Sequence, residues 1–347
     1  MFFASDNAGP AHPEVLDALA KANDGYAAAY GNDTLMDAVR TRIRDVFEAP
    51  DAAVYLVATG TGANSLALAT LGQPYETVFC SPVAHIHEDE CNAPEFYTGG
   101  AKLTLVGDGD KMSAAALRAS ILKEGTRGVH GPQRGPVSIT QVTERGTVYS
   151  LEELSALCDT AREFGLPVHL DGARFANAMV ALDCTAAEMT WKAGVDAVSF
   201  GGTKNGLMGV EGVIFFDPSK AWEFELRRKR GAHLFSKHRY LSAQMLAYLT
   251  GDLWLRSARA ANDNAAYLAQ GLREAGVAFA HEPQANMLFP RMPRGLHRRI
   301  YAEGAVYHLW DGSLEGDDEN ELLTARLVCD WSIPRGEIDR FLTIVAG

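Results

Sequence analysis

The chain has 347 residues, of which 47% are hydrophobic and 22% charged, so it has ample material for a buried core and is not a disordered protein. Its formal net charge of −12 argues against a nucleic acid or an anionic membrane as partner, because both attract Lys and Arg. No apolar run is long enough to cross a bilayer, and no basic segment followed by an apolar one opens the chain. We therefore expect a cytoplasmic protein that acts on a small molecule.

The cysteines do not have the pattern of a disulfide or zinc framework. They are odd in number and widely spaced, and no two of them have the CxxC spacing. We expect reduced thiols at Cys80, Cys91, Cys158, Cys184 and Cys329.

Up to about residue 216, the apolar pattern alternates between helices and strands. Helical spacing predicts helices over residues 13–21 and 35–47, and a short apolar run at 53–58 leads through a glycine turn into a helix at 65–71. Two further helices are expected at 150–164 and 185–192. The alternation predicts an α/β fold with a mostly parallel sheet covered on both faces, whose other strands lie at 77–81, 102–106, 137–142, 167–171, 197–200 and 212–216.

From about residue 241 the pattern changes to long helices, at 243–249 and 254–275. Shorter strand-like pieces follow, and a last helix begins near residue 334. We interpret this part as a smaller α+β unit. The expected organisation is a large domain with an N-terminal arm, residues 1–251, and a small C-terminal domain, residues 252–347.

The first of four informative strand ends is the turn Gly-Thr-Gly-Ala-Asn at 60–64. Ligands collect at the carboxyl ends of parallel strands, and backbone N–H groups of Gly60 and Thr61 at a helix N-terminus are suited to a phosphate. A glycine turn of this kind has a purely structural role about as often as it binds a phosphate. A Rossmann dinucleotide site is not expected, because the segment 79–85 after the next strand offers no acid for a ribose. A Walker A loop is excluded, since no Lys-Ser or Lys-Thr follows the glycines.

The second strand end carries His85, His87, Glu88 and Glu90. These residue types can bind a metal, but no other residues show a matching ligand spacing, and we expect no metal. A single imidazole at a strand end is also able to stack on an aromatic cofactor. A purely structural histidine is the remaining interpretation of His85.

The third and fourth strand ends supply an acid and a lysine. An apolar strand ends in Asp171 with Arg174 three residues later, and another ends in Lys204 among glycines and small residues. Taken singly, such an aspartate usually caps a helix and such a lysine usually faces solvent. Together the four ends match pyridoxal 5′-phosphate (PLP) chemistry: the lysine forms an imine with the cofactor aldehyde, and the aspartate favours the protonated pyridine ring.

With these residues identified, the chain resembles the threonine aldolases of the fold-type I PLP superfamily over nearly its whole length. The marks of the resemblance are Ser-Asp-Asn at 5–7, Tyr-Gly-Asn-Asp at 30–33, the turn at 59–64, His-Ile-His at 85–87, Leu-Asp-Gly-Ala-Arg at 170–174 and Phe-Gly-Gly-Thr-Lys-Asn-Gly at 200–206. The resemblance implies PLP as cofactor and retro-aldol cleavage of L-threonine, L-allo-threonine and related β-hydroxy-α-amino acids such as phenylserine to glycine and an aldehyde.

The resemblance also implies roles for single residues. Lys204 would be the Schiff-base lysine, Asp171 the partner of the pyridine nitrogen, His85 the stacking residue, and Gly60 with Thr61 the phosphate cradle. The substrate carboxylate would be held by a set of three residues, a task that suits the guanidinium fork. That set is Ser5, Arg174 and Arg326.

One residue departs from the family pattern. Many members have a histidine near the substrate hydroxyl, and Glu144 stands at the corresponding position here. An acid there is able to accept the β-hydroxyl proton. His85, His130 and an ordered water are the alternatives for this base.

The resemblance further implies a homo-oligomer, either a dimer or a tetramer, whose subunits share active sites. In it, Tyr30 would lie near the active site of the partner subunit. Within the same superfamily, a β-eliminating lyase or an aminotransferase is the alternative function. From another class, a binding protein that keeps the fold without turnover is the second alternative. The joint presence of Lys204, Asp171 and His85 favours an enzyme.

Overall fold

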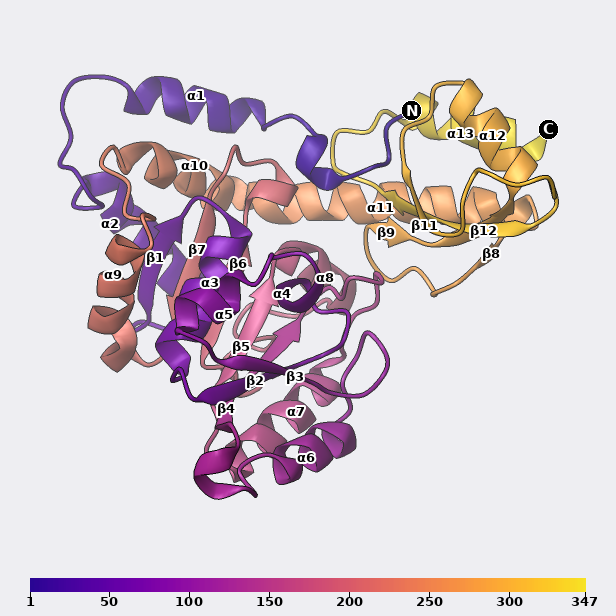
Figure 1. Ribbon diagram of the computed structural model, residues 1–347. Helices are drawn as coiled ribbons and strands as arrows, with labels where there is room; N and C mark the ends of the chain where they lie inside the picture. The colour runs from indigo at the N-terminus through magenta and orange to yellow at the C-terminus, as the bar shows by residue number, and fades with distance from the viewer.

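The computed structural model describes residues 1–347 and contains two sheets (Figure 1). The larger sheet has seven strands in the order β1-β7-β6-β5-β4-β2-β3, and the smaller has five. The strands of the larger sheet are β1 (Ala53–Val57), β2 (Glu76–Cys80), β3 (Lys102–Leu105), β4 (Gln133–Thr140), β5 (Val168–Gly172), β6 (Ala197–Gly201) and β7 (Glu211–Phe215). The strands of the smaller are β8 (Ala278–Phe279), β9 (Met287–Leu288), β10 (Pro290–Pro293), β11 (His308–Asp311) and β12 (Leu322–Val328).

Helices cover both faces of the larger sheet, and one long helix leads from it to the smaller sheet (Figure 1). The α-helices are α1 (Pro13–Ala22), α2 (Thr34–Val46), α3 (Gly60–Leu71), α4 (His85–Glu88), α5 (Ala93–Thr98), α6 (Ala114–Lys123), α7 (Leu151–Glu163), α8 (Phe175–Leu182), α9 (Ala221–Arg230), α10 (Arg239–Leu249), α11 (Leu253–Glu274), α12 (Arg294–Ala302) and α13 (Arg335–Ala346). Short 3₁₀ turns are η1 (Asp6–Ala8), η2 (Gly128–His130), η3 (Thr203–Asn205), η4 (Pro218–Lys220) and η5 (Thr250–Asp252).

The predicted α/β fold with a mostly parallel sheet is confirmed. β2 to β6 run parallel, and β7 alone runs antiparallel to both of its neighbours, β6 and β1. The carboxyl ends of β1, β4, β5 and β6 therefore meet at one edge of the sheet, where β7 begins. The polar residues that follow these strands are brought to this edge.

Successive residues of the central strands pack on opposite faces, as a buried strand requires. Val54 and Leu56 belong to a core of 48 buried residues shared with α2, α7, α8 and α10. Ala53, Tyr55 and Val57 pack on the other face beneath α3 and α9. The sheet is thus buried on both sides, which leaves only its edges for a ligand.

The smaller sheet packs with α11 and α13 around a separate core of 16 buried residues, and both chain termini lie in this part (Figure 1). Phe3 belongs to that core, and the chain beside it pairs with residue 306 through the bridge between Phe2 and Val306. The N-terminal arm thus runs back across the molecule. The division at residue 252 falls at η5, just before α11, and we retain it as a proposal.

One predicted helix is wrong. Residues 185–192 form a series of turns rather than a helix. Thr185 and Glu188 cap each other's backbone N–H groups as at a helix start, but the following hydrogen bonds span three, four or five residues and converge on the carbonyl groups of Ala187 and Thr190. Gly194, at φ +106°, then turns the chain into the next strand.

All five cysteines are free thiols, as the sequence predicted. None of the helices combines the length and the apolar character that a membrane crossing requires.

Candidate active site

A cavity of about 230 Å³ lies at the carboxyl-end edge of the larger sheet. Its wall contains Lys204, Asp171, His85, Gly60 and Thr61, so the four strand ends identified in the sequence meet in one place. The rest of the wall is formed by Asn7, Ala58, Thr59, Asn64, Glu90, Ala173, Thr203 and Glu211.

The N-terminus of α3 forms one side of this cavity. The glycine turn predicted before the helix is the first turn of the helix itself, which begins at Gly60 with Thr59 as its cap. The Thr59 hydroxyl accepts the N–H of Gly62 at 3.0 Å. The first turn of a helix leaves N–H groups without partners inside the helix, and no atom lies within 4 Å of a Cβ built on Gly60. The N–H groups of Gly60 and Thr61 therefore border open space suited to an anion.

A hydrogen-bonded chain connects the acid of β5 to the histidine of α4. The Nδ2 atom of Asn64 donates to Asp171 at 3.0 Å and to Glu90 at 2.9 Å, and His85 Nδ1 donates to the same oxygen of Glu90 at 2.9 Å. Asp171 also accepts the N–H of Ala173 at 3.0 Å. Asp171, Asn64 and Glu90 are buried, so these contacts fix their orientation.

The electrostatic surroundings of His85 favour its protonated form. Burial of the ring opposes protonation, but the hydrogen bond to Glu90 and the charges of Asp171 and Glu144 outweigh it, and the pKa of His85 is raised. Because Nδ1 is bonded to Glu90, Nε2 is the ring nitrogen left for a ligand.

Lys204 lies in η3, a turn whose neighbouring residues are fixed by packing and hydrogen bonds. The Asn205 side chain donates to the Tyr248 hydroxyl at 2.6 Å and to the Trp254 carbonyl at 2.8 Å. Gly206 has φ +106°, and a Cβ there would lie 2.3 Å from the His12 ring. The residues around the lysine are therefore fixed, while Lys204 itself is only half-buried and lines the cavity.

Arg174 is buried and bound by a carboxylate of its own chain. Its Nε and Nη2 atoms donate to the two carboxylate oxygens of Asp6 at 2.7 and 3.0 Å. Burial raises the pKa of Asp6, but the charges of Arg174 and Lys204 outweigh burial and hold it below the ordinary value. This pair connects the N-terminal arm to the end of β5.

Arg326 of β12 and Glu144 lie beside that pair. Arg326 donates to the carbonyl oxygen of Ala4 at 3.3 Å, next to Ser5. Burial lowers the pKa of Arg326, as does the charge of Arg174, whereas Glu144 acts in the opposite direction. Glu144 is half-buried in the turn after β4, outside the cavity wall, and its charge also acts on His85 and Arg174.

Three further sequence candidates lie in different places. The Ser5 oxygen accepts the N–H of Asn7 at 3.1 Å, which leaves its hydroxyl proton free. Tyr30 has φ +62°, is 45% exposed and is not part of the cavity wall of its own chain. His130 ends the exposed turn η2 before the amino end of β4, far from the carboxyl-end edge, so it is excluded as the hydroxyl base.

The sequence interpretation missed the roles of Asn64, Glu90 and Glu211. Asn64 stands in the quoted turn, and Glu90 was considered only as a metal ligand. Of that acidic and histidine-rich segment, His87 and Glu88 are exposed while Glu90 is buried, so the segment does not converge on a metal. Glu211 opens an apolar strand, and an acid at the start of a buried strand, followed by glycine, was the available signal.

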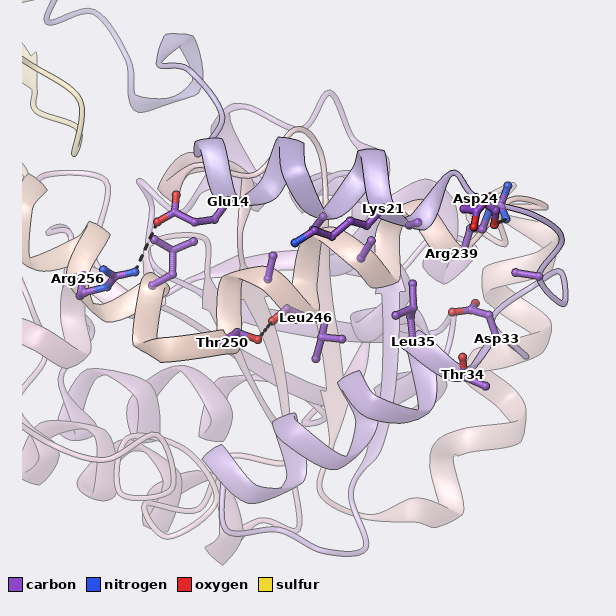
Figure 2. A pocket seen from close by; sticks show the side chains of 16 residues that line it. Glu14, Lys21, Asp24, Asp33, Thr34, Leu35, Arg239, Leu246, Thr250 and Arg256 are labelled. Carbon is purple, nitrogen blue, oxygen red and sulfur yellow. Dashed lines mark hydrogen bonds and ion pairs between the residues drawn. The ribbon is translucent and has the colours of Figure 1, made fainter.

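A second hollow shows that volume alone does not identify the site. Figure 2 shows the side chains that line a groove between α1, α2 and α10. Its volume is about 500 Å³. Glu14 and Arg256 form a loose ion pair across it at 3.7 Å, and Lys21 and Arg239 border it. None of the lysine, histidine and aspartate residues of the motifs at the strand ends faces this groove.

Comparisons with known proteins agree with the geometry of the cavity. The sequence model of the β-eliminating lyase family matches residues 3–293. The chain is 40% identical to a low specificity L-threonine aldolase of a Pseudomonas species, over 97% of this chain and 94% of the relative.

Solved structures show the same fold. A threonine aldolase of Leishmania major superposes with a TM-score of 0.92 at 26% identity, over 99% of this chain and 98% of the other. A serine palmitoyltransferase of S. paucimobilis, solved with bound PLP and myriocin, shares the fold at a TM-score of 0.71 and 15% identity, over 100% of this chain and 86% of the other. The chain belongs to the threonine aldolase and β-eliminating lyase family, whose members are carbon-carbon lyases with the fold-type I architecture of PLP-dependent enzymes.

Proposed function

We propose that this protein uses PLP to cleave L-threonine, L-allo-threonine and related β-hydroxy-α-amino acids into glycine and an aldehyde. The observation that carries the proposal is the convergence of Lys204, Asp171, His85 and the N-terminus of α3 on one cavity. Each supplies a different part of what PLP needs. The 40% identity to a low specificity L-threonine aldolase supports the choice of reaction.

The donor set of the cavity fits PLP. The N–H groups of Gly60 and Thr61 would hold the phosphate, Asp171 the pyridine nitrogen, and the amine of Lys204 the aldehyde carbon, with the His85 ring over one face. When bound, PLP supplies an electron sink for the bond that breaks at the amino-acid Cα. Asn64 keeps the Asp171 carboxylate turned toward the cavity, since it donates to Asp171 Oδ2 at 3.0 Å.

Binding of the substrate carboxylate would fall to Arg326 and Ser5, with Arg174 beside them. The Nε and Nη2 atoms of Arg174 already donate to Asp6, so only the Nη1 atom of Arg174 is free for a ligand. Arg326 has only a 3.3 Å bond to a carbonyl and a 3.8 Å contact to the sulfur of Met287, both weak enough to exchange for a carboxylate. We therefore assign the main carboxylate contact to Arg326.

The proton of the substrate β-hydroxyl would be accepted by Glu144 or by His85. We favour Glu144 because it stands where many family members have the histidine near the substrate hydroxyl, and its charge acts on His85, Arg174 and Arg326. His85 is the alternative, through its Nε2 atom. The hydrogen bond to Glu90 and the charges around His85 raise its pKa and so favour its protonated form, and we assign Glu144 as the base.

Product analysis tests the proposed reaction. The cofactor-loaded protein, incubated with L-threonine, is expected to release glycine and acetaldehyde in equal amounts, measured by chromatography and by an aldehyde-coupled assay. The β-eliminating lyase alternative would give 2-oxobutanoate and ammonia instead, and an aminotransferase would give a keto acid without ammonia. Either of these product sets, without glycine, would refute retro-aldol cleavage.

We further propose a cytoplasmic homo-oligomer, at least a dimer, in which Tyr30 reaches the active site of the partner subunit. The exposure of Tyr30 outside its own cavity supports this arrangement. The free state of all five cysteines supports a reducing compartment.

A further inference from the structure

Glu211 is a buried carboxyl on the wall of the active-site cavity. It opens β7, where it pairs in register with Val57 of β1 and Gly201 of β6, and it is 7% exposed. It lines the cavity together with Lys204. The proposed reaction does not yet use this acid.

The contacts of Glu211 lead directly to the turn that carries the lysine. Its Oε2 atom accepts the N–H of Gly202 at 2.7 Å, and the neighbouring hydroxyl and N–H of Thr203 act on the carboxyl by lowering its pKa. The Thr203 hydroxyl in turn accepts the N–H of Val210 at 3.2 Å. Glu211 is thereby bonded to Gly202, at the start of the turn that carries Lys204, and lies beside Thr203 on the same cavity wall.

No guanidinium or ammonium group is committed to Glu211, in contrast to the other acid beside Lys204. The charge of Lys204 acts on both Asp6 and Glu211, but Asp6 is already paired with Arg174 at 2.7 Å. The other ionisable groups that face Glu211 are the Tyr248 hydroxyl from α10 and, across the cavity, Asp171 from β5. His85 and Glu90 line the same cavity, but Lys204 is the cation whose charge lowers the pKa of Glu211.

Glu211 titrates near neutral pH. Burial raises its pKa to about 7, while the Thr203 hydroxyl, the Gly202 N–H and the Lys204 charge act in the opposite direction. A positive charge on the lysine nitrogen and a negative charge on the buried carboxyl thus stabilise each other.

We propose that Glu211 is a positioning residue that controls how tightly the nitrogen of Lys204 holds its proton. The inference rests on the proposed function, in which that nitrogen must exchange between the cofactor aldehyde and the free amine. A neutral amine attacks a carbonyl carbon and a protonated one does not. An ionised Glu211 favours the protonated nitrogen, so the acid sets the pH range in which Lys204 reacts.

The first test is a pH titration of the absorbance of the cofactor-loaded protein. Glu211→Gln keeps an oxygen for the Gly202 N–H but removes the charge, and the midpoint of the titration is expected to fall by about one pH unit or more. Glu211→Asp keeps the charge and is expected to remain near the midpoint of the unsubstituted protein. An unchanged midpoint in Glu211→Gln would overturn the inference.

Asp196 provides a matched control. It too is a carboxyl with a raised pKa that accepts a backbone N–H, that of Val168 at 2.7 Å, but it is only partly buried, and it precedes β6 whereas Lys204 follows it. Asp196→Asn is expected to leave the midpoint unchanged. An equal shift in this variant would show a general effect of charge and would also overturn the inference.

A second measurement separates this inference from the proposed function. In the cofactor-free protein, the rate of acylation of Lys204 by acetic anhydride near pH 7 can be followed by mass spectrometry of its peptide. Glu211→Gln is expected to raise this rate about ten-fold, as a shift of one pH unit implies. An unchanged rate would contradict the inference even in a protein that cleaves threonine, and a ten-fold rise would support it even in one that does not.

Discussion

The two ends of the seven-stranded sheet differ in a way that volume does not reveal. The hollow at the amino ends of the strands, of about 740 Å³, is larger than the active-site cavity of about 230 Å³. It is also lined by charges of both signs, including Arg134, Arg162, Lys220, Asp196 and Asp217. Both ends even contain a carboxyl with a raised pKa bonded to a backbone N–H. A charged hollow with a perturbed acid is therefore not sufficient to mark a site.

What distinguishes the carboxyl end is the convergence of unlike groups. The N-terminus of α3, the lysine of η3 and the chain from Asp171 through Asn64 and Glu90 to His85 all border one cavity. Parallel strands direct the segments that follow them to this edge, and helices begin there with free N–H groups. The amino end receives helix C-termini and loops instead. The difference is one of direction, and it can be tested by matched substitutions at the two ends.

The largest effect is expected for the lysines. Lys204→Ala should reduce threonine cleavage by about 100-fold or more without unfolding the protein, because the amine that joins the cofactor is lost. Lys220 lines the hollow at the amino end, and Lys220→Ala should leave the rate unchanged. Steady-state kinetics and circular dichroism check both variants. A folded Lys204→Ala protein with near-native activity would contradict the assignment.

The buried ion pair should dominate stability. The side chains of Asp6 and Arg174 are 1% and 2% exposed, and Asp6→Asn should cost about 3–5 kcal/mol because it leaves a buried cation unpaired. The exposed pair of Asp159 and Arg162, near the amino end, is the control, and Asp159→Asn should cost less than about 1 kcal/mol. Denaturant unfolding at neutral pH measures both.

The same pair gives a pH dependence. Because the pKa of Asp6 in the folded protein is lowered, its stabilising effect is complete above the ordinary carboxyl pKa of about 4 and is lost as the pH falls through the lowered value. The stability difference between the unsubstituted protein and Asp6→Asn should therefore shrink below about pH 4. A difference that stays constant into the acid range would show that Asp6 does not act through its charge.

An intermediate effect is expected for Glu144. Glu144→Gln should slow cleavage of threonine and allo-threonine about ten-fold or more, since positioned proton transfer contributes about a hundred-fold or more. Glu76 lines the hollow at the amino end, and Glu76→Gln should have no effect on the rate. Rates measured across pH with both diastereomers isolate the proton transfer. Unchanged rates and an unchanged diastereomer ratio at every pH would rule out Glu144 and leave His85 or an ordered water as the base.

The smallest effect is expected for Tyr30. Tyr30→Phe should change the kinetics about two- to ten-fold, the range of one hydrogen bond, without altering cofactor content. Tyr75, which is 64% exposed at the amino end just before β2, is the control, and Tyr75→Phe should be neutral. Sedimentation should detect no active monomer. An active monomer at assay concentration would refute a site shared between subunits.

The sequence predicted which residues meet at the carboxyl ends of the strands, but not the contacts between them. Alternation of strands and helices, together with polar residues after the strands, was enough to bring Lys204, Asp171 and His85 to one edge. The contacts within that edge were not predictable. The pair of Asp6 and Arg174 joins residues 168 positions apart, and nothing local in either segment indicates it.

Local patterns also failed where tertiary packing decides. In the sequence, Glu211 has the pattern of an ordinary polar residue at the start of a strand. It lines the cavity with Lys204 only because β7 runs antiparallel between β6 and β1, so that its first residue lies at the carboxyl-end edge. Glu90 follows the short helix α4, whose single turn buries it while His87 and Glu88 face solvent. Residues 185–192 have helical spacing, yet their hydrogen bonds form turns.

The central claim is that the carboxyl-end cavity holds PLP on Lys204. Reduction of the loaded, active protein with borohydride fixes the cofactor to the amine that holds it, and trypsin does not cleave after a lysine modified in this way. We predict one pyridoxyl-bearing peptide, running from Ala193 to Lys220 with the modification on Lys204. A pyridoxyl group on Lys220 or on any other lysine, with Lys204 unmodified, would contradict the account.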